Sequence, residues 1–175
     1  MAGIFYLGTM EHNSKHENLN KIPSALIKGM YTTMLRIRYC EEKLAELLEK
    51  KEIRCPVHLY TGQEAIATGV CAALKKDDYV HGGHRSHGHY LAKGGSMKTM
   101  LAEIYGKTTG CSGGRGGSMH LYAGDIGILG TVPIVAATIP LSVGTALATV
   151  LKKDHRVSVS FFGDGAKNDR LWILC

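Results

Sequence analysis

An aspartate between two glycines, near the end of the chain, has the setting of a metal ligand beside a bound phosphate. Residues 160–166 read SFFGDGA, so Asp164 directly follows a hydrophobic run that ends at Phe162. In open α/β sheets, ligands bind at the carboxyl ends of the strands. A lone carboxylate suits Mg²⁺, which keeps phosphate and water as its other ligands, and Gly163 and Gly165 would let a diphosphate approach the backbone. Because Asp-Gly is also a common turn sequence, the pattern alone leaves a plain turn open.

Four histidines and an arginine crowd the segment HGGHRSHGHYLAKG, residues 81–94. Neutral imidazoles bind zinc or copper, so a metal cluster is one interpretation. The segment has neither an HxxxH pair nor a Cys/His pairing, and its glycines make a fixed geometry difficult. Arg85 favours an anion instead, because a guanidinium makes paired hydrogen bonds to phosphate oxygens. A solvated polar loop is the third interpretation that this segment leaves open.

Glycines are concentrated in the middle of the chain, where 14 of the 22 lie between Gly82 and Gly130. The segment YGKTTG (105–110) contains GKT, but a Walker A loop would need a glycine where the chain has Leu101. The segment GCSGGRGGSMH (110–120) carries no GxGxxG after a strand, so a dinucleotide fingerprint is absent. A flexible loop near a phosphate and a structural turn both remain open for it.

The residues around these segments predict the helices and the strand that would position them. Apolar residues recur at helical spacing from Pro23 to Leu48, and Pro56 is expected to end that helix. Thr61–Glu64 reads as a capping box, in which Glu64 serves as a cap of the following helix. Further helices are expected at 65–74, 96–105 and 140–151, and the alternating, β-branched run 156–162 predicts a strand.

Composition restricts the class of protein. The chain has 175 residues, of which 45% are hydrophobic and 21% charged, as in one globular domain. Its net charge of +6 comes from scattered lysines and arginines, which argues against a nucleic-acid partner. The apolar segment 1–10 is too short for a membrane span and lacks the basic start of a signal peptide. No association with a membrane is therefore expected. Five cysteines without a CxxC favour reduced thiols in the cytoplasm.

Five ordered segments together resemble one family of enzymes. The chain closely resembles the α subunit of the E1 component of thiamine-diphosphate-dependent 2-oxo acid dehydrogenase complexes, in the pyruvate and acetoin dehydrogenase branch. The resemblance covers nearly all of residues 24–166 and implies an α/β fold, a parallel sheet flanked by helices, of the thiamine-diphosphate-binding type. The five segments are HLYTGQEA (58–65), HRSHGHYLAKG (84–94), GGRGGSMH (113–120), PIVAATIPLSVGTALA (133–148) and SFFGDGA (160–166).

The resemblance also implies roles for individual residues. Asp164 matches the aspartate that holds Mg²⁺ on the cofactor diphosphate, and Arg85 matches an arginine that binds the diphosphate. His84 takes the neighbouring contact position, which is often tyrosine in the family, and His58 matches a histidine near the reacting centre. Ile134 and Val135 match the segment whose backbone meets the aminopyrimidine ring. The other implied cofactor contacts are Gly163, Gly165 and Ala166, in the turn whose backbone touches the diphosphate.

The family implies a reaction and a set of partners. The reaction is oxidative decarboxylation of a 2-oxo acid such as pyruvate, or acetoin cleavage, with thiamine diphosphate and Mg²⁺ as cofactors. The α subunit would work with an E1 β subunit in a heterotetramer and pass the acyl group to a lipoyl-bearing E2 acyltransferase. The glutamate that activates the aminopyrimidine belongs to the β subunit in the family, so it is not expected in this chain.

The end of the chain departs from the family pattern. Residues 167–175 do not resemble the acidic helix that follows GDGA in the family, and the asparagine pair that completes the Mg²⁺ site is missing. We therefore expect a polar N-terminal arm at 1–22, the N-terminal part of a thiamine-diphosphate-binding domain at 23–166, and an atypical, truncated tail at 167–175 that leaves the fold incomplete. A catalytically inactive fragment and a His-rich metal-binding module are the alternative functions.

Overall fold

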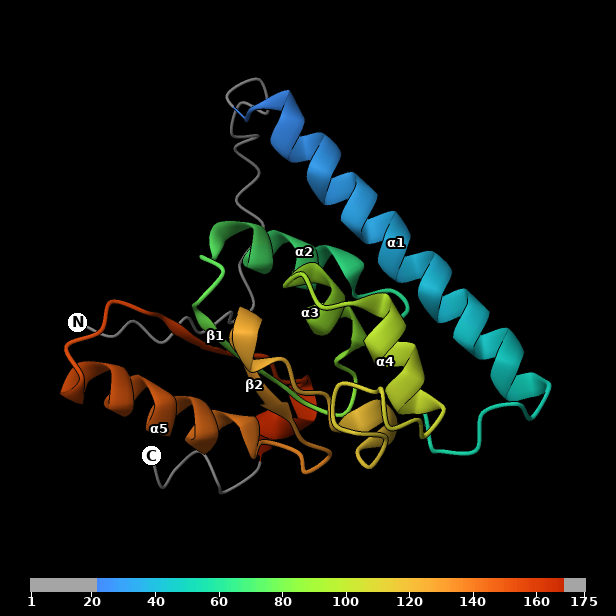
Figure 1. Ribbon diagram of the computed structural model, residues 1–175. Helices are drawn as coiled ribbons and strands as arrows, with labels where there is room; N and C mark the ends of the chain where they lie inside the picture. The colour runs from blue at the N-terminus through green and yellow to red at the C-terminus, as the bar shows by residue number, and fades with distance from the viewer. Residues whose placement is uncertain (1–21, 169–175) are drawn as a thin grey trace.

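The computed structural model describes residues 22–168, and in it a small sheet lies between one helix on one face and a group of helices on the other (Figure 1). The predicted N-terminal arm and C-terminal tail therefore lie almost entirely outside the described residues. The elements in chain order are α1 (Ser24–Glu49), α2 (Glu64–Ala73), β1 (Tyr79–Gly82), α3 (His87–Ala92), α4 (Met97–Ile104), η2 (Gly117–Met119), η3 (Gly124–Ile126), β2 (Ile128–Thr131), α5 (Thr138–Leu151), β3 (Ser158–Ser160) and η4 (Asp164–Asn168).

Three parallel strands form the sheet in the order β2-β1-β3. Val80 of the central strand β1 is in register with Ile128 on one side and with Val159 on the other. α5 packs against β1 and β3, and α1, α2 and α3 cover the opposite face of the sheet (Figure 1). The predicted fold class, a parallel sheet flanked by helices, is confirmed. Because the strands are parallel, all three carboxyl ends meet at one edge of the sheet.

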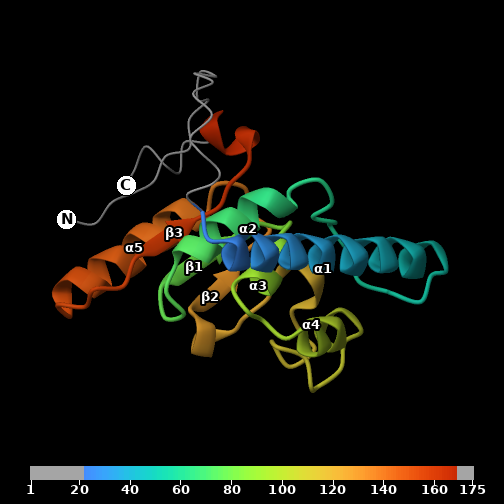
Figure 2. The ribbon, with the colours of Figure 1, turned by 90° about the horizontal axis from the view of Figure 1, so that it is seen from above.

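The long helix α1 packs on the domain along one face and extends past the sheet on the side away from α5 (Figure 2). It ends at Glu49 and not near Pro56 as predicted, because the chain turns at Lys51, which has a left-handed φ of 57°. Residues three and four positions apart share one side of a helix. The buried residues of α1, which have this spacing, are Ile37, Cys40, Glu41 and Leu44.

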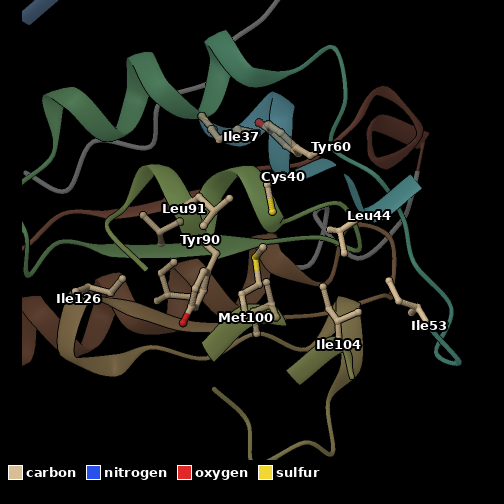
Figure 3. Close-up of a cluster of buried hydrophobic side chains, with 14 residues drawn as sticks. Ile37, Cys40, Leu44, Ile53, Tyr60, Tyr90, Leu91, Met100, Ile104 and Ile126 are labelled. Atoms are coloured by element: carbon tan, nitrogen blue, oxygen red, sulfur yellow. The ribbon is translucent and has the colours of Figure 1, made fainter. Parts of the chain in front are cut away.

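The hydrophobic core lies between α1, α3, α4 and the sheet (Figure 3). Leu44 of α1 and Met100 of α4 are completely buried in it, and Leu91 of α3 is almost completely buried. Burying a side chain of this kind stabilises a fold by roughly 1.5–3 kcal/mol. The cluster therefore holds α1 and α4 against the rest of the domain.

The predicted capping box at the start of α2 is wrong. α2 begins at Glu64 with Gln63 as its N-cap, and no side chain caps its first turn. The Oε1 atom of Glu64 instead accepts hydrogen bonds from Nε of Arg38 at 2.7 Å and from the Gly62 N–H at 3.1 Å. The bond from Arg38 is the main reason why the pKa of Glu64 is lowered. Glu64 thus joins the loop before α2 to α1.

The other predicted elements are present with shifted ends. The helix expected at 96–105 is α4, whose N-cap Ser96 accepts a hydrogen bond from the Thr99 N–H. The helix expected at 140–151 is α5, which begins earlier at Thr138, and the expected strand is the shorter β3. Among the helices of residues 22–168, none combines the length and the apolar character that a membrane crossing requires.

Candidate functional site

A cleft of about 350 Å³ opens where the carboxyl ends of the three strands meet. Its walls come from the segments that follow β1, β2 and β3, together with residues from the start of α2. This is the edge at which open α/β sheets bind ligands, and the volume is in the usual range for small-molecule sites. The residues that line the cleft are Tyr60, Gln63, Ile66, Gly83, His84, Arg85, His89, Ile134, Val135, Ala136, Thr138, Phe161, Phe162, Gly163, Asp164, Gly165 and Ala166.

The fold brings the predicted cofactor contacts together, although they lie far apart in the sequence. His58 is the one predicted site residue that does not line the cleft. Its ring packs edge-on against that of His84, with the ring centroids 5.0 Å apart, so it lies directly beside the cleft. The individual roles of all the predicted site residues remain predictions. The predicted residues that line the cleft are His84, Arg85, Ile134, Val135, Gly163, Asp164, Gly165 and Ala166.

Arg85 is the permanent cation of the cleft. Its side chain is exposed, and its Nη1 atom donates a hydrogen bond to the carbonyl oxygen of Leu59 at 2.7 Å. This bond holds the guanidinium and leaves its other N–H groups free for a ligand. Burial lowers the pKa of the neighbouring His84, and the proximity of His58 and of the Arg85 guanidinium lowers it further. His84 is therefore neutral at pH 7, and the positive charge at this wall belongs to Arg85.

The loop between β2 and α5 presents apolar side chains at the cleft. Ile134 and Val135 are 63% and 45% exposed, although large aliphatic side chains are usually buried. The next residue, Ala136, is buried with a left-handed φ of 64°, which costs a residue with a Cβ roughly 1–3 kcal/mol. Strain of this kind is concentrated at ligand sites. Here it accompanies a turn that leaves Ile134 and Val135 uncovered.

The segment after β3 forms a short turn with open space beside it. The Ala166 N–H donates a hydrogen bond to the Gly163 carbonyl at 3.1 Å, and Asp164 is exposed. A Cβ added at Gly163 or Gly165 would meet no protein atom within 4 Å, so a ligand can approach this backbone. Among the described residues that line the cleft, Asp164 is the single carboxylate. One carboxylate with phosphate and water is a ligand set that Mg²⁺ accepts.

Three aromatic side chains form the floor of the cleft, and the family resemblance implied a cofactor contact for none of them. The ring of His89 stacks on Phe161 with centroids 3.9 Å apart, and its Nε2 lies 3.1 Å from the Tyr60 hydroxyl. Burial lowers the pKa of His89 to about 3 and raises that of Tyr60. The floor is therefore uncharged at neutral pH. The histidine run was the one local signal for it, because it contains His89.

We predict that acid destabilises the chain partly through His89. Its folded pKa of about 3 lies below the ordinary value of 6.5, so in mild acid the unfolded state binds a proton that the native state excludes. Between about pH 6 and pH 4, His89 should therefore lower the free energy of unfolding by about 1.4 kcal/mol for each pH unit. Urea unfolding of the chain at several pH values measures this slope.

The matched variant is His89→Phe, which keeps an aromatic ring on Phe161 and has no titrating nitrogen. Its unfolding free energy should fall less steeply over the same pH range. His81, whose pKa burial also lowers, should account for part of the slope that remains. An unchanged slope in the variant would show that His89 is already protonated in the native state.

The other histidines of the run have separate structural partners. Nε2 of His81 lies 3.1 Å from the Thr145 hydroxyl, and the two ring nitrogens of His87 lie 2.8 Å from Glu41 and from Ser118. Within residues 22–168, no three His, Cys, Asp or Glu side chains gather to hold a metal ion. The described residues therefore do not support a His-rich metal-binding module.

The second glycine-rich segment wraps around a buried carboxylate. Oε2 of Glu103 accepts hydrogen bonds from the N–H groups of Ser112 and Gly114, at 2.7 and 2.8 Å. Oε1 of Glu103 accepts from Gly116 and Gly117, at 2.6 and 3.2 Å. The backbone donors that could have held a phosphate are therefore already occupied. Of the two interpretations left open by the sequence, the structural turn is correct.

The fold and the cleft define a class: an α/β protein with a parallel sheet and a cleft at the carboxyl edge of that sheet. The family model described as dehydrogenase E1 component matches residues 32–170, and the chain belongs to this family. This result agrees with the resemblance seen in the sequence.

Relatives within the family carry more specific names. The chain is 48% identical over 139 residues to the alpha subunit of acetoin:2,6-dichlorophenolindophenol oxidoreductase of Bacillus subtilis (strain 168), covering 79% of this chain and 42% of that protein. It is 40% identical over 161 residues to the pyruvate dehydrogenase E1 component subunit alpha of Rhizobium meliloti (strain 1021), covering 92% and 44%. With the same subunit of Porphyra purpurea the identity is 39% over 153 residues, covering 83% and 44%. The chain thus spans less than half the length of these curated relatives.

Proposed function

We propose that this chain acts as an E1 α subunit that binds thiamine diphosphate and Mg²⁺ at the carboxyl edge of its sheet. The observation that carries the proposal is the convergence of Arg85, Ile134, Val135 and Asp164 on one cleft from three separate strand ends. Membership of the dehydrogenase E1 family supports thiamine diphosphate as the cofactor. The names of the relatives support pyruvate, another 2-oxo acid or acetoin as the substrate.

The residues of the cleft fit the chemistry of this cofactor. A diphosphate is anionic and would bind the exposed guanidinium of Arg85, because charge-assisted hydrogen bonds to phosphate are strong. Gly163 and Gly165 leave the adjoining space open, and Asp164 would share Mg²⁺ with the diphosphate. Ile134 and Val135 offer uncovered apolar surface to the flat aminopyrimidine ring. The diphosphate and the aminopyrimidine ring thus each find residues of matching chemistry.

In the reaction, the protein would anchor the cofactor, neutralise the charge of its diphosphate and exclude water from the cleft. Bound thiamine diphosphate supplies an electron sink for cleavage of the bond next to the substrate's carbonyl group. Arg85 and Asp164 would fix the charged end of the site, while the uncharged floor that includes His89 and Phe161 keeps its interior apolar. The imidazole of His58, which lies against His84, would hold or move a proton beside the cleft.

The same proposal includes partners and a location. We expect an E1 β subunit to complete the site, to supply the activating glutamate and to form a heterotetramer with this chain. The acyl group would then pass to a lipoyl-bearing E2 acyltransferase. The relatives are named as α subunits, which supports a multi-subunit enzyme. A cytoplasmic location rests on the cysteine pattern, and some relatives are named mitochondrial or chloroplastic.

Cofactor titration by calorimetry tests this function. With the chain co-expressed with an E1 β subunit, we expect thiamine diphosphate to bind only when Mg²⁺ is present. Arg85→Ala should weaken that binding by roughly 1.5–3 kcal/mol, the contribution of a hydrogen bond to a charged group. Without the β subunit, binding should be weak or absent, because the part of the site that we expect the β subunit to contribute would be missing.

The matched control is Arg115→Ala, which removes an exposed arginine from the glycine-rich segment, outside the cleft. Its affinity for thiamine diphosphate should equal that of the unmodified chain. Equal affinities of the Arg85→Ala and Arg115→Ala variants for thiamine diphosphate would show that Arg85 does not bind the cofactor. No binding by the assembly of both subunits would contradict the proposed function itself.

A further inference from the structure

A buried hydrogen-bond network lies behind the wall of the cleft and takes no part in the chemistry proposed above. Glu41, on α1, has no exposed surface. Its Oε2 atom accepts a hydrogen bond from the Tyr60 N–H at 2.8 Å, and its Oε1 atom lies 2.8 Å from Nδ1 of His87. Nε2 of His87 lies 2.8 Å from the Ser118 hydroxyl. One carboxylate therefore joins α1, the segment before α2 and the start of α3.

The network has the connectivity of a nucleophile triad, in the order carboxylate, imidazole and hydroxyl. Ser118 is only 1% exposed, and His87 and Glu41 are 0% exposed. None of the three lines the cleft. Because no substrate could reach the hydroxyl, the network does not supply a nucleophile, and its effect must come from the geometry that it fixes.

Both partners of Glu41 adjoin the rim of the cleft. Tyr60 follows Leu59 in the chain, and the Leu59 carbonyl is the oxygen that accepts the hydrogen bond from Nη1 of Arg85 at 2.7 Å. His87 follows Arg85 by two residues. A shift of either segment would therefore change the distance between the Leu59 carbonyl and the guanidinium. A carboxylate buried this deeply is tolerated when hydrogen bonds satisfy it, and those bonds resist such a shift.

We propose that Glu41 is a positioning residue that directs the Arg85 guanidinium by holding the segment of Leu59 and the segment of Arg85 in register. The direct contact to the anion is made by Arg85, and Glu41 acts through it. The consequence for cofactor binding rests on the proposed function of the cleft. Loss of Glu41 should weaken binding of a diphosphate but leave contacts to the rest of the cofactor intact.

Three substitutions at position 41 test this idea. Glu41→Gln can still accept from the Tyr60 N–H and can donate to Nδ1 of His87 when the imidazole proton moves to Nε2. Nitrogen chemical shifts of His87 should report that change of tautomer, and the affinity for thiamine diphosphate should stay within about threefold. Glu41→Ala loses both bonds, and Glu41→Asp keeps the charge but is too short to make both. For these two variants, co-expressed with an E1 β subunit, we expect about a tenfold or larger loss of affinity.

Thiamine without phosphates is the discriminating ligand, and Ser118→Ala is the control variant. The affinity for thiamine should be unchanged in all position-41 variants, because Arg85 does not contact it. Ser118→Ala removes the far end of the network and should change the affinity for thiamine diphosphate by less than about threefold. The proposal is overturned if Glu41→Asp keeps full affinity for thiamine diphosphate, or if its affinities for thiamine and thiamine diphosphate fall equally. Should Glu41→Ala fail to fold, Glu41→Asp decides.

A readout without cofactor separates this proposal from the proposed function. In the chain itself, Glu41→Asp should speed hydrogen exchange of the Tyr60 amide. It should also lower the NMR order parameter of the Arg85 side chain. If neither the variants nor the unmodified assembly binds thiamine diphosphate, the proposed function is wrong. The two measurements on the chain alone still test whether Glu41 positions Arg85. An Arg85 side chain that stays equally ordered while the Tyr60 amide exchanges faster would overturn that positioning role.

Discussion

Replacing Glu103 with alanine is expected to lower the free energy of unfolding by about 3–5 kcal/mol. The carboxylate is completely buried, and four backbone N–H groups of the glycine-rich segment donate to it. Alanine would leave these donors buried without an acceptor, and each such group costs about 1–3 kcal/mol unless water replaces the lost partner. Urea unfolding followed by circular dichroism measures the loss.

Two comparisons separate this effect from the loss of any carboxylate. Glu49→Ala removes an exposed carboxylate at the end of α1 and should change stability by less than about 0.5 kcal/mol. Burial alone would raise the pKa of Glu103, but the backbone donors outweigh it and the net pKa lies below 4.5. The stabilisation is therefore complete above pH 4.5 and is lost as the pH falls through the folded pKa. A stability gap between the unmodified chain and Glu103→Gln that does not narrow in acid would contradict this account.

The cleft could be predicted from the sequence because its residues follow local patterns. Asp164 stands between glycines at the end of an apolar, β-branched run, and such a run predicts both the strand and the edge that the aspartate occupies. Arg85 had a local signal, its place in the histidine-rich segment 81–94. Ile134 was reached only through the family resemblance, since a lone isoleucine has no local signature. The helices were found by their period, whereas the end of α1 depends on the backbone of one residue, Lys51.

The buried polar groups could not be predicted, because nothing local distinguishes them. Glu41 and Glu103 each lie on an amphipathic helix, where a charged side chain is usually exposed. The His87 partner of Glu41 is 46 residues away, and a pairing at that distance depends on the tertiary fold. The capping box failed for the same reason: the side chain of Glu64 found a stronger partner in Arg38, on another helix.

In a full-length α subunit assembled with an E1 β subunit, Asp164→Ala is expected to remove almost all turnover. If this carboxylate holds Mg²⁺ on the diphosphate, its removal takes away the metal's link to the protein on this side of the site. Metal anchoring is worth several kcal/mol, and each 1.36 kcal/mol changes a rate tenfold, so the loss should be on the order of a thousandfold. Decarboxylation of pyruvate, or acetoin cleavage, measured with an artificial electron acceptor over a range of Mg²⁺ concentrations is the assay.

The exposure of Asp164 makes this test selective. Because the side chain is exposed, its removal should change the free energy of unfolding by less than about 0.5 kcal/mol. Asp125→Ala removes another exposed aspartate, outside the cleft, and should alter neither stability nor turnover. Loss of turnover in Asp164→Ala at unchanged stability would therefore identify a ligand and not a structural residue. Normal turnover with the normal Mg²⁺ dependence would instead mean that other groups hold the metal, and that the glycines beside Asp164 serve only the turn.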